Sequence, residues 1–126
     1  MNKLFFILVF SVLFSCSSSD DTPNNNVNSF SPPTWIIGTW LNQEDFDLGI
    51  PRGFKFTNQQ YCQILLTSNN CLDGTLITEE SKTESDYKFT YGISSLSTNL
   101  HFRKLNNNQI EVLNSIGVVQ DTFTKQ

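Results

Sequence analysis

The chain has few of the residues on which catalysis and nucleic-acid binding depend. Its 126 residues include one histidine, three cysteines, and eight lysines and arginines against twelve aspartates and glutamates. It contains no nucleophile elbow, zinc-protease motif or phosphate-cradling glycine loop. An acidic chain without a basic run argues against nucleic acid as a partner. We therefore expect no enzyme activity, no cofactor or metal, and no nucleic-acid partner.

An apolar run long enough to cross a membrane is also missing. The N-terminal run, Leu4 to Leu13, follows a single charge, Lys3. It is shorter than the roughly 20 residues that a membrane-spanning helix needs. The pattern is typical of a secretory signal peptide, so we expect residues 1–15 to be removed on export.

The end of this segment, Leu13-Phe14-Ser15-Cys16, resembles the bacterial lipobox. The resemblance implies that Cys16 receives diacylglycerol and becomes the N-terminus, although Phe14 is bulkier than the usual residue at its position. Each buried acyl CH2 contributes about 0.8 kcal/mol, so several chains would anchor the protein firmly. We expect a lipid-anchored protein of the outer membrane, on its periplasmic face or at the cell surface. Ordinary secretion with a free Cys16 thiol is the alternative.

A polar segment follows, in which Ser, Asn, Asp and Pro dominate and Phe30 is the one large apolar residue. Such a composition cannot bury enough area to offset its ordering entropy. We expect residues 16–33 to be the lipidated cysteine and a flexible linker, and residues 34–126 to be the folded domain. Asp20 and Asp21 either resemble the acidic run of surface-exported lipoproteins or belong to a solvated spacer.

From Trp35 onward the apolar pattern has a period of two, which indicates half-buried strands. The segments Phe54–Phe56, Tyr87–Tyr91 and Leu100–Arg103 alternate apolar and polar residues. Polar turn clusters separate them, including Ser68–Gly74, and Asn tolerates the positive φ of tight turns. We predict strands near residues 36–42, 53–57, 61–67, 75–81, 86–92, 98–105, 109–115 and 118–124.

Eight short antiparallel strands with little helix predict an all-β, up-and-down β-barrel, because closure removes the sheet edges. An open sandwich is the alternative. Gly38-Thr39-Trp40, preceded by Ile36 and Ile37, resembles the G-x-W signature that opens the lipocalin barrel. With the lipobox and linker, the chain resembles small bacterial lipocalin-like lipoproteins. The resemblance implies that Gly38 allows a close approach and that Trp40 plugs one end of the barrel. It also implies an Arg from the last strand packed on Trp40, where this chain has only Lys125.

Cys62 and Cys71 are the remaining pair once Cys16 is lipidated. In an oxidising compartment we expect them to form a disulfide with Cα atoms within about 4.4–6.8 Å of each other. Two reduced thiols are the alternative. A metal site is disfavoured by the spacing and by the single histidine, His101, which we expect to be a solvated surface residue.

The function we expect is a membrane-anchored binding module for a small apolar ligand or lipid. Filling of the narrow interior by side chains alone is the alternative state, since eight-stranded barrels hold at most one small ligand. A protein-interaction module, such as a lysozyme inhibitor that presents the Cys62–Cys71 loop, and a surface assembly subunit are the other functions; the oligomeric state is left open. The candidate lining residues are Phe54, Phe56, Tyr87, Phe89, Tyr91, Leu100 and Phe102.

Overall fold

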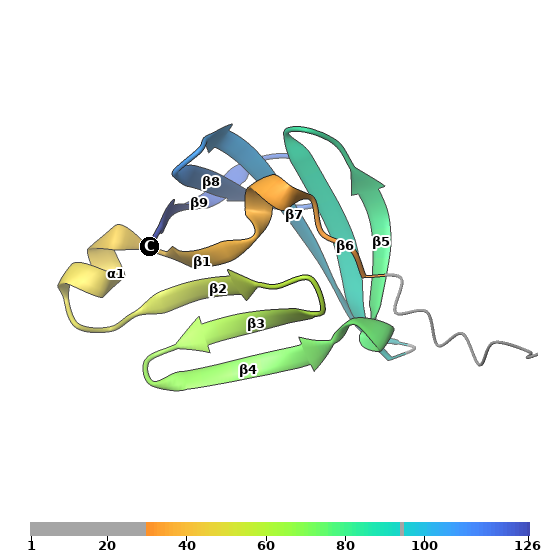
Figure 1. Ribbon diagram of the computed structural model, residues 1–126, viewed down its shortest axis with the longest axis horizontal. Coiled ribbons are helices and arrows are strands. Elements are labelled where there is room, and N and C mark those ends of the chain that lie inside the picture. The colour runs from red at the N-terminus through yellow and green to blue at the C-terminus, as the bar shows by residue number, and fades with distance from the viewer. Residues whose placement is uncertain (1–29, 94) are drawn as a thin grey trace, which may run out of the picture.

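The structure is a computed structural model that describes residues 30–93 and 95–126. Nine strands and three short helical elements make up this part of the chain (Figure 1). In chain order they are η1 Thr34–Ile36, β1 Gly38–Leu41, α1 Gln43–Asp47, β2 Arg52–Phe56, β3 Gln60–Leu65, β4 Ser68–Asp73, η2 Gly74–Leu76, β5 Ile77–Lys82, β6 Asp86–Ile93, β7 Leu96–Asn106, β8 Gln109–Leu113 and β9 Val119–Lys125.

All nine strands belong to one antiparallel sheet with the order β4-β3-β2-β1-β9-β8-β7-β6-β5. The first strand joins the two halves, because β1 pairs with β2 on one side and with β9 on the other. The sheet curls so that its two end strands, β4 and β5, approach each other at η2, which connects them. The two strands do not pair. The predicted all-β, up-and-down barrel is therefore confirmed in a nearly closed form.

One strand was missed by the sequence pattern. The cluster Ser68–Gly74, predicted to be a turn, is strand β4, which pairs residue by residue with β3. Its residues are mostly polar and exposed, so it lacks the apolar alternation by which strands are recognised. The turn itself is shorter and lies at Leu66-Thr67. Helix α1 also falls in a stretch for which no helix was predicted.

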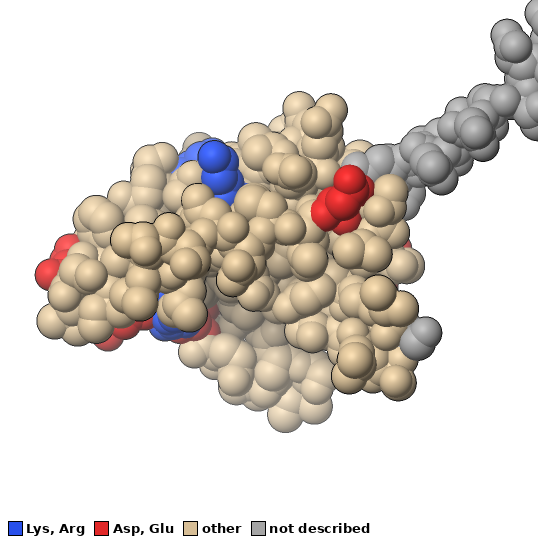
Figure 2. Space-filling view, turned by 90° about the horizontal axis from the view of Figure 1, so that it is seen from below, with Lys and Arg blue, Asp and Glu red and all other residues tan. Residues whose placement is uncertain are grey.

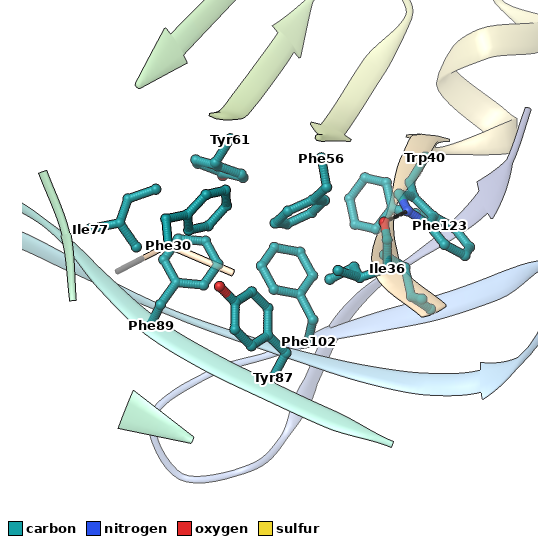
Figure 3. Close-up of a cluster of buried hydrophobic side chains, with 11 residues drawn as sticks. Phe30, Ile36, Trp40, Phe56, Tyr61, Ile77, Tyr87, Phe89, Phe102 and Phe123 are labelled. Atoms are coloured by element: carbon teal, nitrogen blue, oxygen red, sulfur yellow. Dashed lines mark hydrogen bonds between the residues drawn. The ribbon is translucent and has the colours of Figure 1, made fainter. Parts of the chain in front are cut away.

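Aromatic side chains dominate the space inside the curled sheet (Figure 3). Trp40, Tyr61, Tyr87, Phe89 and Phe102 are each fully buried. The phenylalanine and tyrosine rings of the core meet mostly edge to face, with the centroids of these pairs 4.8–6.4 Å apart, a geometry that favours aromatic pairs. The core cluster consists of Phe30, Ile36, Trp40, Phe56, Tyr61, Ile77, Tyr87, Phe89, Phe102, Ile110 and Phe123.

The segment before η1 belongs to the fold, although the sequence assigned it to the linker. Phe30 is buried, and its ring lies edge to face with that of Phe89. The Ser31 backbone N–H donates to Glu79 Oε1 over 2.7 Å, and Lys82 Nζ donates to the Ser31 carbonyl over 2.6 Å. The folded part thus includes residue 30, four residues before the predicted boundary. The rest of the predicted linker, residues 16–29, lies outside the described residues.

Within residues 30–93 and 95–126, no helix has the length and apolar character needed to span a bilayer. The predicted signal peptide, residues 1–15, and the lipidation site Cys16 fall outside the described residues, so both stay predictions.

Candidate functional site

The seven residues expected to line the interior all lie in the core or against it. Four of them, Phe56, Tyr87, Phe89 and Phe102, are buried in the aromatic cluster. Phe54, Tyr91 and Leu100 are half-buried and pack against it. The alternation read from the sequence therefore assigned these side chains to the correct face of the sheet.

The rings fill the space in which a ligand would have to sit. The ring of Phe56 contacts those of Tyr61 and Phe102 at centroid distances of 5.1 and 5.2 Å, and Phe54 lies 4.8 Å from Phe123. Such spacing is contact distance for aromatic rings. The described residues therefore form a packed aromatic core.

The polar atoms inside the barrel already have partners. Tyr87 Oη donates to Glu79 Oε1 over 2.8 Å, and Gln63 Nε2 donates to the hydroxyls of Tyr61 and Tyr91 over 3.2 and 2.9 Å. Burial raises the pKa of Tyr61 and, together with the bond to Glu79, that of Tyr87. No buried side-chain nitrogen or oxygen among the described residues lacks a hydrogen bond. The interior thus presents no unsatisfied group that would orient a ligand.

The G-x-W residues lie where the first and last strands meet. Trp40 is fully buried, and its Nε1 donates to the Ile36 carbonyl over 2.7 Å. Lys125, its register partner on β9, places Nζ 5.2 Å from the centre of the indole. Gly38 has a φ of +134°, and a Cβ there would lie 2.8 Å from Lys125 Cε. These contacts join the first strand of the barrel to the last.

The predicted disulfide between Cys62 and Cys71 is confirmed. The two cysteines are direct register partners on β3 and β4, and their Cα atoms are 3.9 Å apart, below the predicted range. Opposed residues at non-hydrogen-bonded positions of antiparallel strands have Cα atoms about 4.5 Å apart, so direct opposition favours a short separation. The bond ties the polar strand β4 to β3.

The end of the barrel that carries α1 and the β3–β4 turn exposes large apolar side chains. Leu48 is 73% exposed, and Leu65 and Leu66 are 53% and 50% exposed. The Leu66 backbone N–H donates to the Pro51 carbonyl over 2.7 Å, so the β3–β4 turn lies against the segment that follows α1. We call this group the apolar tip; its members are Phe46, Leu48, Ile50, Leu65 and Leu66.

Leu66 has an unusual backbone conformation. Its φ is +57°, and among the described residues it is the one non-glycine with positive φ. It occupies the first central position of a two-residue turn between Leu65 and Ser68, where positive φ ordinarily requires glycine. A bulky residue held in this region is a genuine outlier, and such strain concentrates at functional sites. The chain keeps a leucine at the tip despite that cost.

A polar network anchors α1 at the base of the apolar tip. Arg52 binds Asp45 through Nε and Asp121 through Nη2, each over 2.6 Å. The hydrogen bond to Asp121, helped by the one to Asp45, raises the pKa of Arg52 despite partial burial. Asn42 accepts the Asp45 backbone N–H as the helix cap and donates to Asp121 Oδ1. These bonds hold the helix to β2 and β9.

On the outer face of β5–β8, His101 is more enclosed than the sequence suggested. Its side chain is 14% exposed, and Nε2 lies 2.7 Å from Asp86 Oδ1. Burial alone would raise the pKa of Asp86, but the bonds to His101 and Ser85 outweigh it and lower that pKa. Beside His101 lies a shallow hollow of about 160 Å³. No group of three or more metal-ligating side chains occurs among the described residues.

No family model matches the chain, and comparison with curated proteins and with solved structures likewise gives no match. The lipocalin-like resemblance therefore rests on the residues quoted above.

Sequence reasoning found the interior residues and the disulfide but missed the apolar tip. A signal for it was present: Leu65 and Leu66 stand together before the predicted turn Ser68–Gly74, and Leu48 and Ile50 lie between the predicted strands 36–42 and 53–57. Apolar residues at such places are commonly assigned to the ends of strands, so only their exposure in the folded structure identifies them as a surface.

Proposed function

We propose that this chain is a lipid-anchored envelope protein whose barrel binds a partner protein through the apolar tip. The observation that carries the proposal is the strained, half-exposed Leu66 at the end of a hairpin braced by the Cys62–Cys71 disulfide. A convex apolar projection of this kind fits a concave site on another protein, and a rigid hairpin loses little entropy on binding.

The position of the tip supports this function. In Figure 1, α1 and the β3–β4 turn lie at one end of the molecule, and the described chain begins at the other. If Cys16 carries lipid, the anchor precedes Phe30 and attaches on that opposite side. The tip would then lie on the side of the domain away from its attachment to the linker, where partners in the periplasm or outside the cell could reach it.

The interior is a weaker candidate for binding. A small apolar ligand or lipid inside the barrel would have to displace rings that are already in contact, such as Phe56 and Phe102. Each displaced ring would lose well-packed contacts and its share of buried area. The lipocalin-like resemblance is therefore proposed for the architecture, with G-x-W and Lys125 as its support, and not for an internal ligand.

The experiment is a comparison of binding and stability in one variant. Glycine relieves the backbone strain at position 66, so Leu66→Gly is expected to raise the free energy of unfolding by about 1 kcal/mol. The same change removes an apolar side chain from the tip, so it is expected to weaken partner binding. A gain in stability with a loss of binding is the pattern of a residue kept for function.

Binding is measured by photo-crosslinking in intact cells, with a photoreactive residue in place of Thr67. We expect an adduct of defined mass from position 67. The control is the same residue at Asn107, in the exposed β7–β8 turn, which should give no such adduct. Leu65→Ser and Leu66→Gly should each abolish the adduct. Adducts of equal yield from positions 67 and 107, or an adduct unaffected by both substitutions, would remove the support for the tip.

A further inference from the structure

The two end strands of the sheet differ in how well their free edges are protected. Strand β5 carries a register shift between Glu79 and Ser81, bears three charged side chains, and is contacted by Ser31. Bulges, charges and covering segments are the usual means by which proteins prevent edge-to-edge pairing. Strand β5 therefore has the features of a protected edge.

Strand β4 lacks such protection along most of its length. It pairs with β3 over six consecutive register positions without a shift, and it contains no proline, lysine or arginine. Its one charge, Asp73, is at its end, and all its residues except Leu72 are exposed. Figure 2, which views the molecule from the side of β4, shows few charged side chains over the centre of this face. Among the described strands, β4 has only β3 as a neighbour.

The disulfide makes this edge rigid as well as free. Cys71 stands in the middle of β4 and is bonded to its register partner on β3. A strand that is already fixed in an extended conformation binds a further strand with little additional ordering cost. Its outward backbone N–H and C=O groups can then be paired by another extended chain.

We propose that β4 is a homodimer interface, at which two copies of this chain pair their β4 strands antiparallel to form one continuous sheet. The choice of a second copy follows from the side chains. A two-fold axis perpendicular to the sheet makes the inner face of one copy continuous with the inner face of the other. Each β4 residue must therefore lie opposite a residue whose side chain points to the same face. Centred on Asn70, the pairing sets Asn70 against Asn70, Asn69 against Cys71 and Ser68 against Leu72 of the second copy.

The side chains that this register sets opposite each other are compatible in charge and in hydrogen bonding. None of its pairs opposes like charges, which would be destabilising in directly opposite positions. An Asn amide both donates and accepts, so two copies of Asn70 can bond to each other. The same pairing at the other edge would bring together strands that each carry Glu79 and Glu80. The inference does not depend on the apolar tip, since it uses the edge of the hairpin and not its turn.

The test is a charge-swap experiment on the chain from Ser17 to Gln126, because the core and all nine strands lie within residues 30–126. Sedimentation velocity over a concentration series should show a monomer–dimer equilibrium for the wild-type sequence. Asn70→Asp and Asn70→Lys should each weaken the dimer roughly tenfold, because each places two like charges at the two-fold axis. An equimolar mixture of the two variants should restore dimers, since opposite charges then meet.

Control variants at Asn107 and a check of folding separate a specific effect at β4 from a general effect of added charge or of unfolding. Asn107→Asp and Asn107→Lys, in the exposed β7–β8 turn, should leave the wild-type equilibrium unchanged, and circular dichroism should show the same strand content in every variant. A wild-type chain that remains monomeric at all concentrations would overturn the proposal. So would a dimer that both Asn70 variants leave intact, or a mixture that fails to recover dimers. A failure of tip crosslinking would leave these results unaffected. Because the dimer register brings Thr67 next to Asp73 of the second copy, an adduct at position 67 counts for the tip only when its mass differs from that of two copies of this chain.

Discussion

The ammonium of Lys125 lies over the indole of Trp40, 5.2 Å from its centre, and so joins the last strand of the barrel to the first. The two residues are also register partners between β9 and β1. A cation over a tryptophan face is attracted by the ring quadrupole and contributes about 0.5–1 kcal/mol at partly exposed sites. Lysine thus occupies the place where the lipocalin-like resemblance implies an arginine.

Gly38 makes this contact sterically possible. Alanine there would need a φ of +134° and would put its Cβ 2.8 Å from Lys125 Cε. We expect Gly38→Ala to cost about 1–3 kcal/mol of unfolding free energy, measured by urea denaturation. Gly49→Ala is the control, since Gly49 has a φ of +74° with no atom near the added Cβ. A smaller loss at position 38 than at position 49 would show that the Lys125 contact is not restrictive.

Trp40 and Trp35 should differ in their contribution to stability. Trp40 is fully buried between the first and last strands, whereas Trp35 is half-buried and donates from Nε1 to the Thr83 carbonyl. Trp40→Ala is expected to cost about 3–5 kcal/mol, a large part of a small domain's stability. Trp35→Ala should cost less, because fewer contacts are lost. Parallel urea melts give the comparison, and equal losses would contradict the burial difference.

The disulfide should stabilise the whole domain. Replacing both Cys62 and Cys71 by alanine is expected to lower the unfolding free energy by roughly 3 kcal/mol, chiefly by releasing a constraint on the unfolded chain. Thiol labelling of the denatured, unreduced wild type should detect neither cysteine. Labelling of both sites, or a double variant as stable as the wild type, would show that the bond does not form in solution.

Asp86 should produce an acid-dependent loss of stability. Its pKa is lowered in the folded protein, where it binds His101 and Ser85. A lowered carboxyl pKa contributes stability above the unfolded-state value of about 3.9 and loses it as the pH falls through the folded value. Between neutral pH and pH 3, Asp86→Asn should therefore lose less stability than the wild type. Identical pH profiles would mean that the Asp86–His101 contact has no net effect.

We expect Cys16 to determine whether the protein is anchored to a membrane. The lipobox resemblance predicts that Cys16→Ala leaves an unprocessed or soluble precursor that no longer fractionates with membranes. Ser17→Ala, next to it, should behave as the wild type. If Cys16→Ala still fractionates with membranes, the anchor is not the lipid on this residue.

The aromatic core was predictable because alternation is a local property: Tyr87, Phe89 and Tyr91 share a face whatever the rest of the chain does. The disulfide was predictable from the cysteine count and the oxidising compartment that the signal-peptide pattern led us to expect. Strand β4 was not, because its place depends on pairing with β3 and on the Cys62–Cys71 bond, both tertiary effects that override weak propensity. Burial of Phe30 and exposure of Leu66 were missed for the same reason, since each depends on contacts with distant segments.

The claim that this barrel binds from its outer surface, with its own rings filling the interior, is tested most directly by native mass spectrometry. The protein is purified in mild detergent from the membranes of its own cells and compared with the same sample under denaturing conditions. We expect the denatured spectrum to give the mass of the processed chain with its covalent lipid. The native spectrum should give this mass and its double for the dimer, with no added small-molecule mass. A stoichiometric additional mass present only in the native spectrum, and lost when Phe89→Trp enlarges a core ring but retained in Leu65→Ser, would show a ligand inside the barrel and contradict the account.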